Sequence, residues 1–257
     1  MSGHRTRGRR RSALVLLAVL MTGGVLAACG SSTPSAPPPS QGVIQDRAVP
    51  GTIPLISSTG QATNLAAYRG KDIVLAPFLS LCQDECPLVT GAFIALQQDV
   101  RAAGLGKDVV FMEITVDPGR DTPARLRAYS KRFGADWVLL TGTPANLKAL
   151  WKFFGVSVQI VPEDQPPKLD WWTGKPLTYD VNHTDGYLLI DKSGHERYAD
   201  ANAPNLHGHL DRRLTSLLNA GGLDNLDHQS GPAWTLTDAL ASVSWLVGRT
   251  IPPVAST

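Results

Sequence analysis

The most constraining feature of the sequence is a short, almost wholly apolar run, Ile73–Phe78. A strand without a polar face must be covered on both sides, which happens at the centre of a parallel or mixed sheet flanked by helices. The chain has 257 residues, 43% of them hydrophobic, and is long enough to bury one such layered core. We therefore expect an α/β fold with Ile73–Phe78 as a central strand.

Further strand and helix patterns alternate after this run. Val109–Val116 and Tyr187–Ile190 predict two more strands, and the turn Asp191–Gly194 predicts an antiparallel partner for the second. This alternation indicates a partly parallel sheet with an antiparallel edge. Helices are predicted from Val89 to Gly104, after Thr122-Pro123, after Thr143-Pro144 and over Asn205–Leu218.

Residues 156–180 interrupt the alternation of strands and helices. They are rich in proline and contain the adjacent Trp171 and Trp172. Long structured insertions are often functional, although two tryptophans also suit the cap of a minor core. We predict an inserted excursion before the strand Tyr187–Ile190.

The N-terminal region has the pattern of an export signal followed by a tether. A basic start precedes the apolar run Ala13–Met21, which is shorter than the roughly 20 residues that a spanning helix needs. Leu26–Cys29 is similar to a bacterial lipobox, which implies a lipoprotein signal peptide over residues 1–28 and acyl chains such as palmitate on Cys29. The alternative is an ordinary signal peptide that happens to carry a cysteine.

Lipidation at Cys29 predicts a location at the cell membrane, lipid-anchored on the extracytoplasmic face. Residues 29–48, rich in proline and serine, then predict a semi-extended tether to a globular part that begins near Val49. The signal segment holds five of the 24 basic residues and no acidic ones, so 19 (24 minus 5) basic residues face 22 acidic ones in the rest. This mildly acidic remainder has no basic stripe, so no nucleic-acid partner is expected.

With Cys29 assigned to the anchor, Cys82 and Cys86 are the remaining cysteines. They lie where the predicted central strand passes into a helix, at a strand end where α/β folds place their sites. A spacing of four residues brings both sulfurs to one side of a helical turn, close enough to share a metal ion or, with adjustment, to form a disulfide. The helix N-terminus favours thiolates, whereas Asp84 and Glu85 oppose this effect and attract a cation. Together these tendencies favour a metal site.

Two thiolates leave a metal ion under-coordinated, so a histidine is the expected third ligand. His183 is the best candidate because it directly precedes the strand Tyr187–Ile190 and can face the cysteine loop across the sheet. Two thiolates and one imidazole suit Cu(I), can hold Cu(II), and accept zinc if water fills a fourth position. Spacing alone leaves open that His183 is an ordinary hydrogen-bonded histidine. Surface positions are expected for His195, His207, His209 and His228.

Three motifs, taken together, resemble the Sco/SenC family. They are Cys82–Pro87 after the central strand, Thr115–Pro123 after the next strand, and Val181–Thr184 before Tyr187–Asp191. The resemblance covers about residues 49–218 and implies a thioredoxin-like domain over residues 49–220. A C-terminal extension, residues 221–257, lies outside it, with a helical stripe that either packs on the domain or meets a partner.

The resemblance implies copper as the bound metal, with Cys82, Cys86 and His183 as its ligands. It further implies delivery of copper to the copper A centre of cytochrome c oxidase, in its copper-bearing subunit, or to a similar copper acceptor. Asp117 matches the aspartate of the family's Val-Asp-Pro motif, which implies a supporting role near the site, against the alternative of a simple turn. The sequence departs from the family at Gln83, where proline is usual, and at Glu85, where a small apolar residue is usual. A third departure is Asn182, where an aspartate is common.

A second class of function is open for the same cysteines. A membrane-anchored thiol-disulfide oxidoreductase would use Cys82 and Cys86 as a redox pair that keeps acceptor cysteines reduced, and it would not need His183. A peroxidase is disfavoured because Leu79 stands where that chemistry uses threonine or serine. An inert structural disulfide is disfavoured because closing so short a loop stabilises little.

Overall fold

An eight-stranded mixed sheet forms the centre of the fold in the order β1-β10-β9-β4-β5-β6-β2-β3. The computed structural model describes residues 1, 3, 42–229 and 231–254, so nearly all of the predicted signal peptide, Cys29 and most of the tether lie outside the described residues. β4 (Asp72–Phe78) runs parallel to β5 (Val109–Thr115), which runs parallel to β6 (Val138–Thr141). Every residue of β4 is buried, which confirms the central strand.

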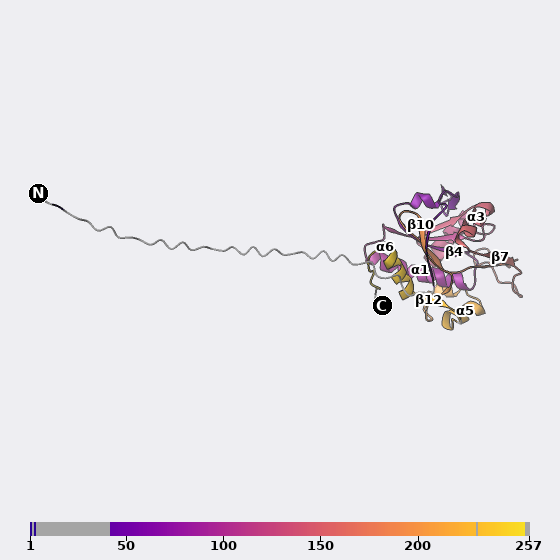
Figure 1. Cartoon of the computed structure of the whole chain (residues 1–257). Helices are drawn as coiled ribbons and strands as arrows, with labels where there is room; N and C mark the ends of the chain where they lie inside the picture. Colours follow the sequence, from indigo (N-terminus) through magenta and orange to yellow (C-terminus); the bar gives the residue numbers. More distant parts are fainter. Residues whose placement is uncertain (2, 4–41, 230, 255–257) are drawn as a thin grey trace. The chain divides into compact units, whose positions relative to one another are not determined.

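Alternate residues of β4 enter two separate apolar clusters, one on each face of the sheet. Leu75 packs with residues of α2 (Pro123–Phe133) and α3 (Pro144–Phe154). Val74 packs with residues of α1 (Glu85–Ala102) and α6 (Leu236–Val247) on the opposite face (Figure 1). The side chains of Thr122 and Thr143 accept hydrogen bonds from backbone amides of the first turn of α2 and α3, as their sequence signatures predict.

The antiparallel part of the sheet differs in one respect from the prediction. β9 (Tyr187–Ile190) pairs antiparallel with both β4 and β10 (His195–Asp200), as expected for a turn-linked pair. However, β1 (Val43–Ala48) pairs with the outer side of β10, so β10 is not an edge strand. The sheet thus begins before Val49, where the sequence indicated the start of the globular part. Between β1 and β4 lie β2 (Leu55–Ser57), β3 (Ala62–Thr63) and a 3-10 helix at Leu65–Tyr68.

The prediction of one helix over Asn205–Leu218 is largely wrong. The segment contains the end of β11 (Ala203–Asn205), a turn, and the short helix α4 (Arg212–Thr215). His207 and Gly208 have φ angles of 50° and 77°, which a right-handed helix does not allow. The leucines that produced the helical spacing are nonetheless buried or partly buried, so the spacing correctly marked apolar positions.

The C-terminal extension packs on the α1 side of the sheet. It contains all but the first residue of α5 (Ala220–Asp227), β12 (Ala233–Thr235), which pairs with β11, and α6. Figure 1 shows α5 and β12 on the same side as α1. α6 buries Leu240 and Val243, so its apolar stripe packs on the domain. Within the described part of the chain, every helix is too short or too polar to cross a membrane.

The excursion between α3 and β9 begins and ends as a two-stranded antiparallel ladder. β7 (Val158–Val161) pairs with β8 (Asp180–His183), and Val158 lies opposite His183. The loop between these strands contains Trp171 and Trp172. The ladder places His183 at the last position of β8, next to the loop that leads into β9.

Candidate metal centre

The two cysteines and the histidine predicted as ligands lie together at one end of the sheet. One ligand atom from each of Cys82, Cys86 and His183 lies within 4.8 Å of the other two. His183 Nε2 lies 3.2 Å from Cys86 Sγ. Both thiols are free, Cys86 is 2% exposed, and the side chain of His183 is 4% exposed. The structure therefore forms a compact, mostly buried group of two sulfurs and one imidazole.

The orientation of His183 is set by its backbone surroundings. Its Nδ1 lies 2.9 Å from the carbonyl oxygen of Thr184, a distance at which Nδ1–H donates and Nε2 is left facing the sulfurs. A carbonyl partner on the far nitrogen is a common way to fix the tautomer of a metal-binding histidine. The imidazole is therefore held with Nε2 toward the two thiols.

The two cysteines occupy different positions relative to α1. Cys86 is the second residue of the helix, whereas Cys82 precedes it, so the sulfurs do not both lie on one helical turn as the spacing suggested. The backbone amide of Cys86 donates a hydrogen bond of 3.4 Å to Cys82 Sγ. An otherwise unpaired amide at the helix N-terminus is thus used to stabilise negative charge on Cys82.

The pKa values of Cys82, Cys86 and His183 are all shifted, and those of the two cysteines are shifted in opposite directions. Hydrogen bonding with Cys86 lowers the pKa of Cys82, and burial opposes this effect. Burial raises the pKa of Cys86. Burial also tends to lower the pKa of His183, but hydrogen bonding with Cys82 and the charge of Asp185 raise it to about 9. The metal-free site therefore stabilises a thiolate at Cys82 beside a protonated imidazole, and a metal ion would displace a proton.

Acidic side chains surround Cys82. Burial raises the pKa of Glu85 to about 8 and that of Asp185 to about 6, and like-charge repulsion adds to the shift at both residues. Burial also raises the pKa of Asp84. A bound cation would offset this excess of negative charge. The donors are soft and few in number, which favours Cu(I) over hard, oxygen-seeking cations.

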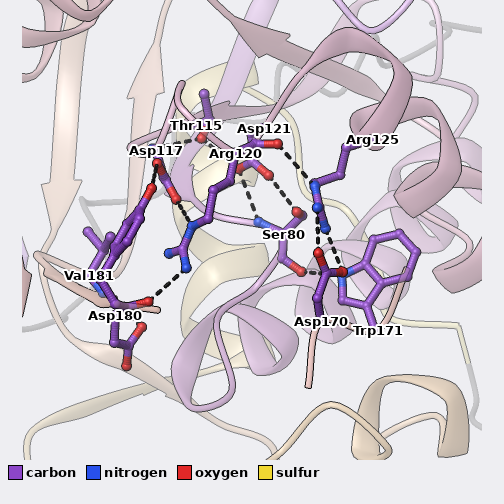
Figure 2. Close-up of polar contacts among 11 residues, drawn as sticks. Ser80, Thr115, Asp117, Arg120, Asp121, Arg125, Asp170, Trp171, Asp180 and Val181 are labelled. Atoms are coloured by element: carbon purple, nitrogen blue, oxygen red, sulfur yellow. Dashed lines mark hydrogen bonds and ion pairs between the residues drawn. The ribbon is translucent and has the colours of Figure 1, made fainter. Parts of the chain in front are cut away.

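Asp117, which Figure 2 shows beside Arg120, contacts the segment that leads into β8. It forms an ion pair with Arg120 and accepts a hydrogen bond of 3.0 Å from Tyr179 Oη. Arg120 in turn donates to the carbonyl oxygen of Tyr179 at 2.7 Å and stacks on its ring. Because Tyr179 directly precedes β8, Asp117 supports the strand that ends in His183 rather than contacting a ligand.

A second anchor, which residue-by-residue reasoning missed, holds the loop before Cys82. Asp121 accepts hydrogen bonds from both the backbone amide and the hydroxyl of Ser80, and from Thr115 Oγ1 at 2.6 Å (Figure 2). Burial raises the pKa of Asp121 to about 6. Trp171 Nε1 donates to the carbonyl oxygen of Ser80 at 2.7 Å. The available signal was the position of Asp121 inside the Thr115–Pro123 motif.

The fold and the site together define a thioredoxin-like domain with a Cys-Cys-His group at one end of its sheet. The SCO1/SenC family model matches residues 43–204, more than half of the chain. The chain therefore belongs to the SCO1/SenC family.

Individual relatives agree with this assignment. The chain is 27% identical over 184 residues to the SCO2-like protein RP587 of Rickettsia prowazekii, which covers 70% of this chain and 84% of that protein. It is 30% identical over 158 residues to Protein SenC of Rhodobacter capsulatus, covering 60% of this chain and 64% of that protein. The copper-bound structure of Arabidopsis thaliana ScoI matches with a TM-score of 0.50 and 19% identity, covering 77% of this chain and 98% of that one. This structural match confirms the fold.

Proposed function

We propose that the chain is a copper-binding assembly factor in which Cys82, Cys86 and His183 bind the ion. The observation that carries the proposal is the convergence of the three soft donor atoms within 4.8 Å of one another. Membership of the SCO1/SenC family supports the choice of copper over zinc, as does the copper-bound state of the related A. thaliana ScoI. The proposed acceptor is the copper A centre of cytochrome c oxidase or a similar extracytoplasmic copper protein.

The geometry suits delivery of copper as well as its retention. Three ligands leave the ion open to a fourth, so a thiolate or imidazole of an acceptor can bind before a ligand of this chain leaves. Of the two cysteines, Cys82 is partly exposed, whereas Cys86 is buried. An acceptor would therefore approach on the side of Cys82.

The proposed location is the extracytoplasmic face of the cell membrane. The sequence Leu26–Cys29 supports it, because acylation of Cys29 would anchor the domain there. Metabolic labelling with a palmitate analogue tests this part, and Cys29→Ala is expected to abolish the label.

Titration of the metal-free, reduced domain with copper tests the proposed ligands. About one copper ion per chain is expected, with a thiolate-to-Cu(II) absorption band when the ion is supplied as Cu(II). Cys82→Ser, Cys86→Ser and His183→Ala should each weaken binding at least tenfold, because loss of a direct ligand costs at least as much as loss of a residue that orients one. His209→Ala, at an exposed histidine, is the matched control. Unchanged stoichiometry and affinity in all three ligand variants would contradict the proposal.

A thiol-disulfide reductase is a second candidate, favoured by the asymmetry of the cysteines. The thiolate of Cys82 would attack an acceptor disulfide, forming a mixed disulfide and releasing one acceptor thiolate, which takes up a proton. Cys86 would then lose its proton and attack Cys82 Sγ, forming the Cys82–Cys86 disulfide and releasing the second acceptor thiolate. Reduction of a model disulfide that persists in His183→Ala would support this activity, and its absence in the wild type would exclude it.

A further inference from the structure

The C-terminal extension touches the residues between the two cysteines. The side-chain amide of Asn225, in α5, donates one hydrogen bond to Asp84 Oδ1 and one to Glu85 Oε1, each 2.8 Å long. A side-chain amide has two N–H groups, so both N–H groups of Asn225 can donate to residues of the loop between Cys82 and Cys86. These two hydrogen bonds join α5 directly to the loop between the thiols.

Two backbone features complete the contact. The amide of Asn219 donates to the carbonyl oxygen of Gln83 at 2.8 Å. Gly222 approaches the same loop so closely that a Cβ there would lie 2.6 Å from Gln83 O and 3.0 Å from Asp84 Cα. Only a residue without a side chain fits this approach. All three residues between the cysteines are therefore held by the segment 219–225.

This segment lies outside the region that matches the family model, which ends at residue 204. It is fixed to the domain independently of the loop, because Leu226 is buried in the same apolar cluster as residues of α1. The loop is therefore tied on two sides, to Asp121 through Ser80 and to the extension through residues 83–85. The second tie is the one nearest to Cys86.

We propose that residues 219–225 form a clamp on the loop between the thiols, with Asn225 as its positioning residue. The clamp holds Cys86 in its buried position and keeps the two sulfurs facing His183. This inference deepens the proposed function, on which its consequence for copper rests. The clamp itself can be tested in the metal-free protein, because it determines how well Cys86 is protected from solvent.

Alkylation of the metal-free, reduced protein, followed by mass spectrometry, measures the clamp directly. In Asn225→Ala, we expect the alkylation rate of Cys86 relative to Cys82 to rise about tenfold, because the loop then opens locally while the rest of the domain stays folded. Asp224→Ala, at an exposed neighbour in the same helix, is the matched control and should leave the ratio unchanged. Global unfolding would also raise this ratio, because it exposes both cysteines and equalises their rates, so circular dichroism under the same conditions is used to confirm that each variant stays folded.

A second variant and a second measurement complete the test. Gly222→Ala forces α5 away from Gln83 and should raise the same alkylation ratio, although it leaves the side chain of Asn225 in place. Copper affinity should fall about tenfold in both variants, within the range seen when residues that orient ligands are lost. An unchanged alkylation ratio in both variants overturns the clamp whatever the copper result. Failure of the wild type to bind copper would contradict the proposed function, and the alkylation ratio would still decide the clamp.

Discussion

Asp170→Asn is expected to lower the free energy of unfolding by about 3 kcal/mol, the lower end of the range for breaking a buried ion pair from one side. Asp170 is 8% exposed and Arg125 is 7% exposed. The guanidinium binds the carboxylate through two hydrogen bonds, of 2.9 and 2.6 Å (Figure 2). The variant keeps the shape of the side chain but leaves the cation of Arg125 buried without its counter-charge. Denaturant unfolding measures the loss.

A surface ion pair provides the matched control for this experiment. Arg101 and Asp136 lie 3.0 Å apart, but their side chains are 52% and 82% exposed. Asp136→Asn should therefore change the free energy of unfolding by less than about 1 kcal/mol. A loss in Asp170→Asn no larger than that of the control would show that the Arg125–Asp170 pair does not stabilise the excursion.

The turn that Asp170 stabilises contacts the loop that leads to the metal centre. The adjacent Trp171 donates its indole hydrogen bond to Ser80, in the loop that leads to Cys82. The backbone amides of Trp172 and Thr173 donate to Asp170 Oδ1, so the carboxylate organises the whole turn. The excursion predicted from its prolines and tryptophans thus packs against the loop that precedes Cys82.

The elements that were predicted correctly are those set by local sequence. The buried strand β4 follows from its unbroken apolar run, and the starts of α2 and α3 follow from Thr-Pro pairs that combine a capping hydroxyl with a preset φ angle. The grouping of Cys82, Cys86 and His183 was predictable because the cysteines follow the central strand β4, whereas His183 shortly precedes β9, the antiparallel neighbour of β4. Those positions converge at one end of an α/β sheet.

The features that were missed depend on contacts between distant residues. Arg125 occupies a helix position that reads as surface, and only the fold brings Asp170 to it from 45 residues away. The left-handed backbone at His207 is not fixed by residue type, because non-glycine residues adopt it in only a few per cent of cases. The contact of Asn225 with Asp84 and Glu85 joins residues more than a hundred positions apart. No periodicity within either segment encodes it.

Relative to the wild type, Glu113→Gln is expected to stabilise the protein at high pH, by about 4 kcal/mol more at pH 9 than at pH 5. Glu113 lies on β5, is 0% exposed, and has its pKa raised by burial from 4.5 to about 8. Between these two values the folded protein keeps a proton that the unfolded chain has lost. The stability that this proton provides is complete below about pH 4.5 and is lost as the pH rises through about 8.

The neutral amide of glutamine can replace the protonated carboxyl group without losing its partners. Glu113 contacts Thr90 Oγ1 at 2.9 Å and Trp137 Nε1 at 3.0 Å. Because the indole only donates, the glutamine oxygen would face Trp137 and its amide would donate to Thr90, whose hydroxyl can also accept. Wild type and variant should therefore have similar unfolding free energies at pH 5 and diverge as the pH rises.

Urea unfolding at several pH values between 5 and 9 measures this divergence. Asp108→Asn, which removes an exposed carboxyl group next to the start of β5, is the matched control and should run parallel to the wild type. A constant difference between Glu113→Gln and wild type across the pH range would mean that Glu113 is ionised in the folded protein at pH 5. Glu113 contacts none of the three proposed ligands, so copper binding should be unchanged in the variant. Urea unfolding and copper titration of this variant therefore report separately on the stability of the sheet and on metal binding by the three proposed ligands.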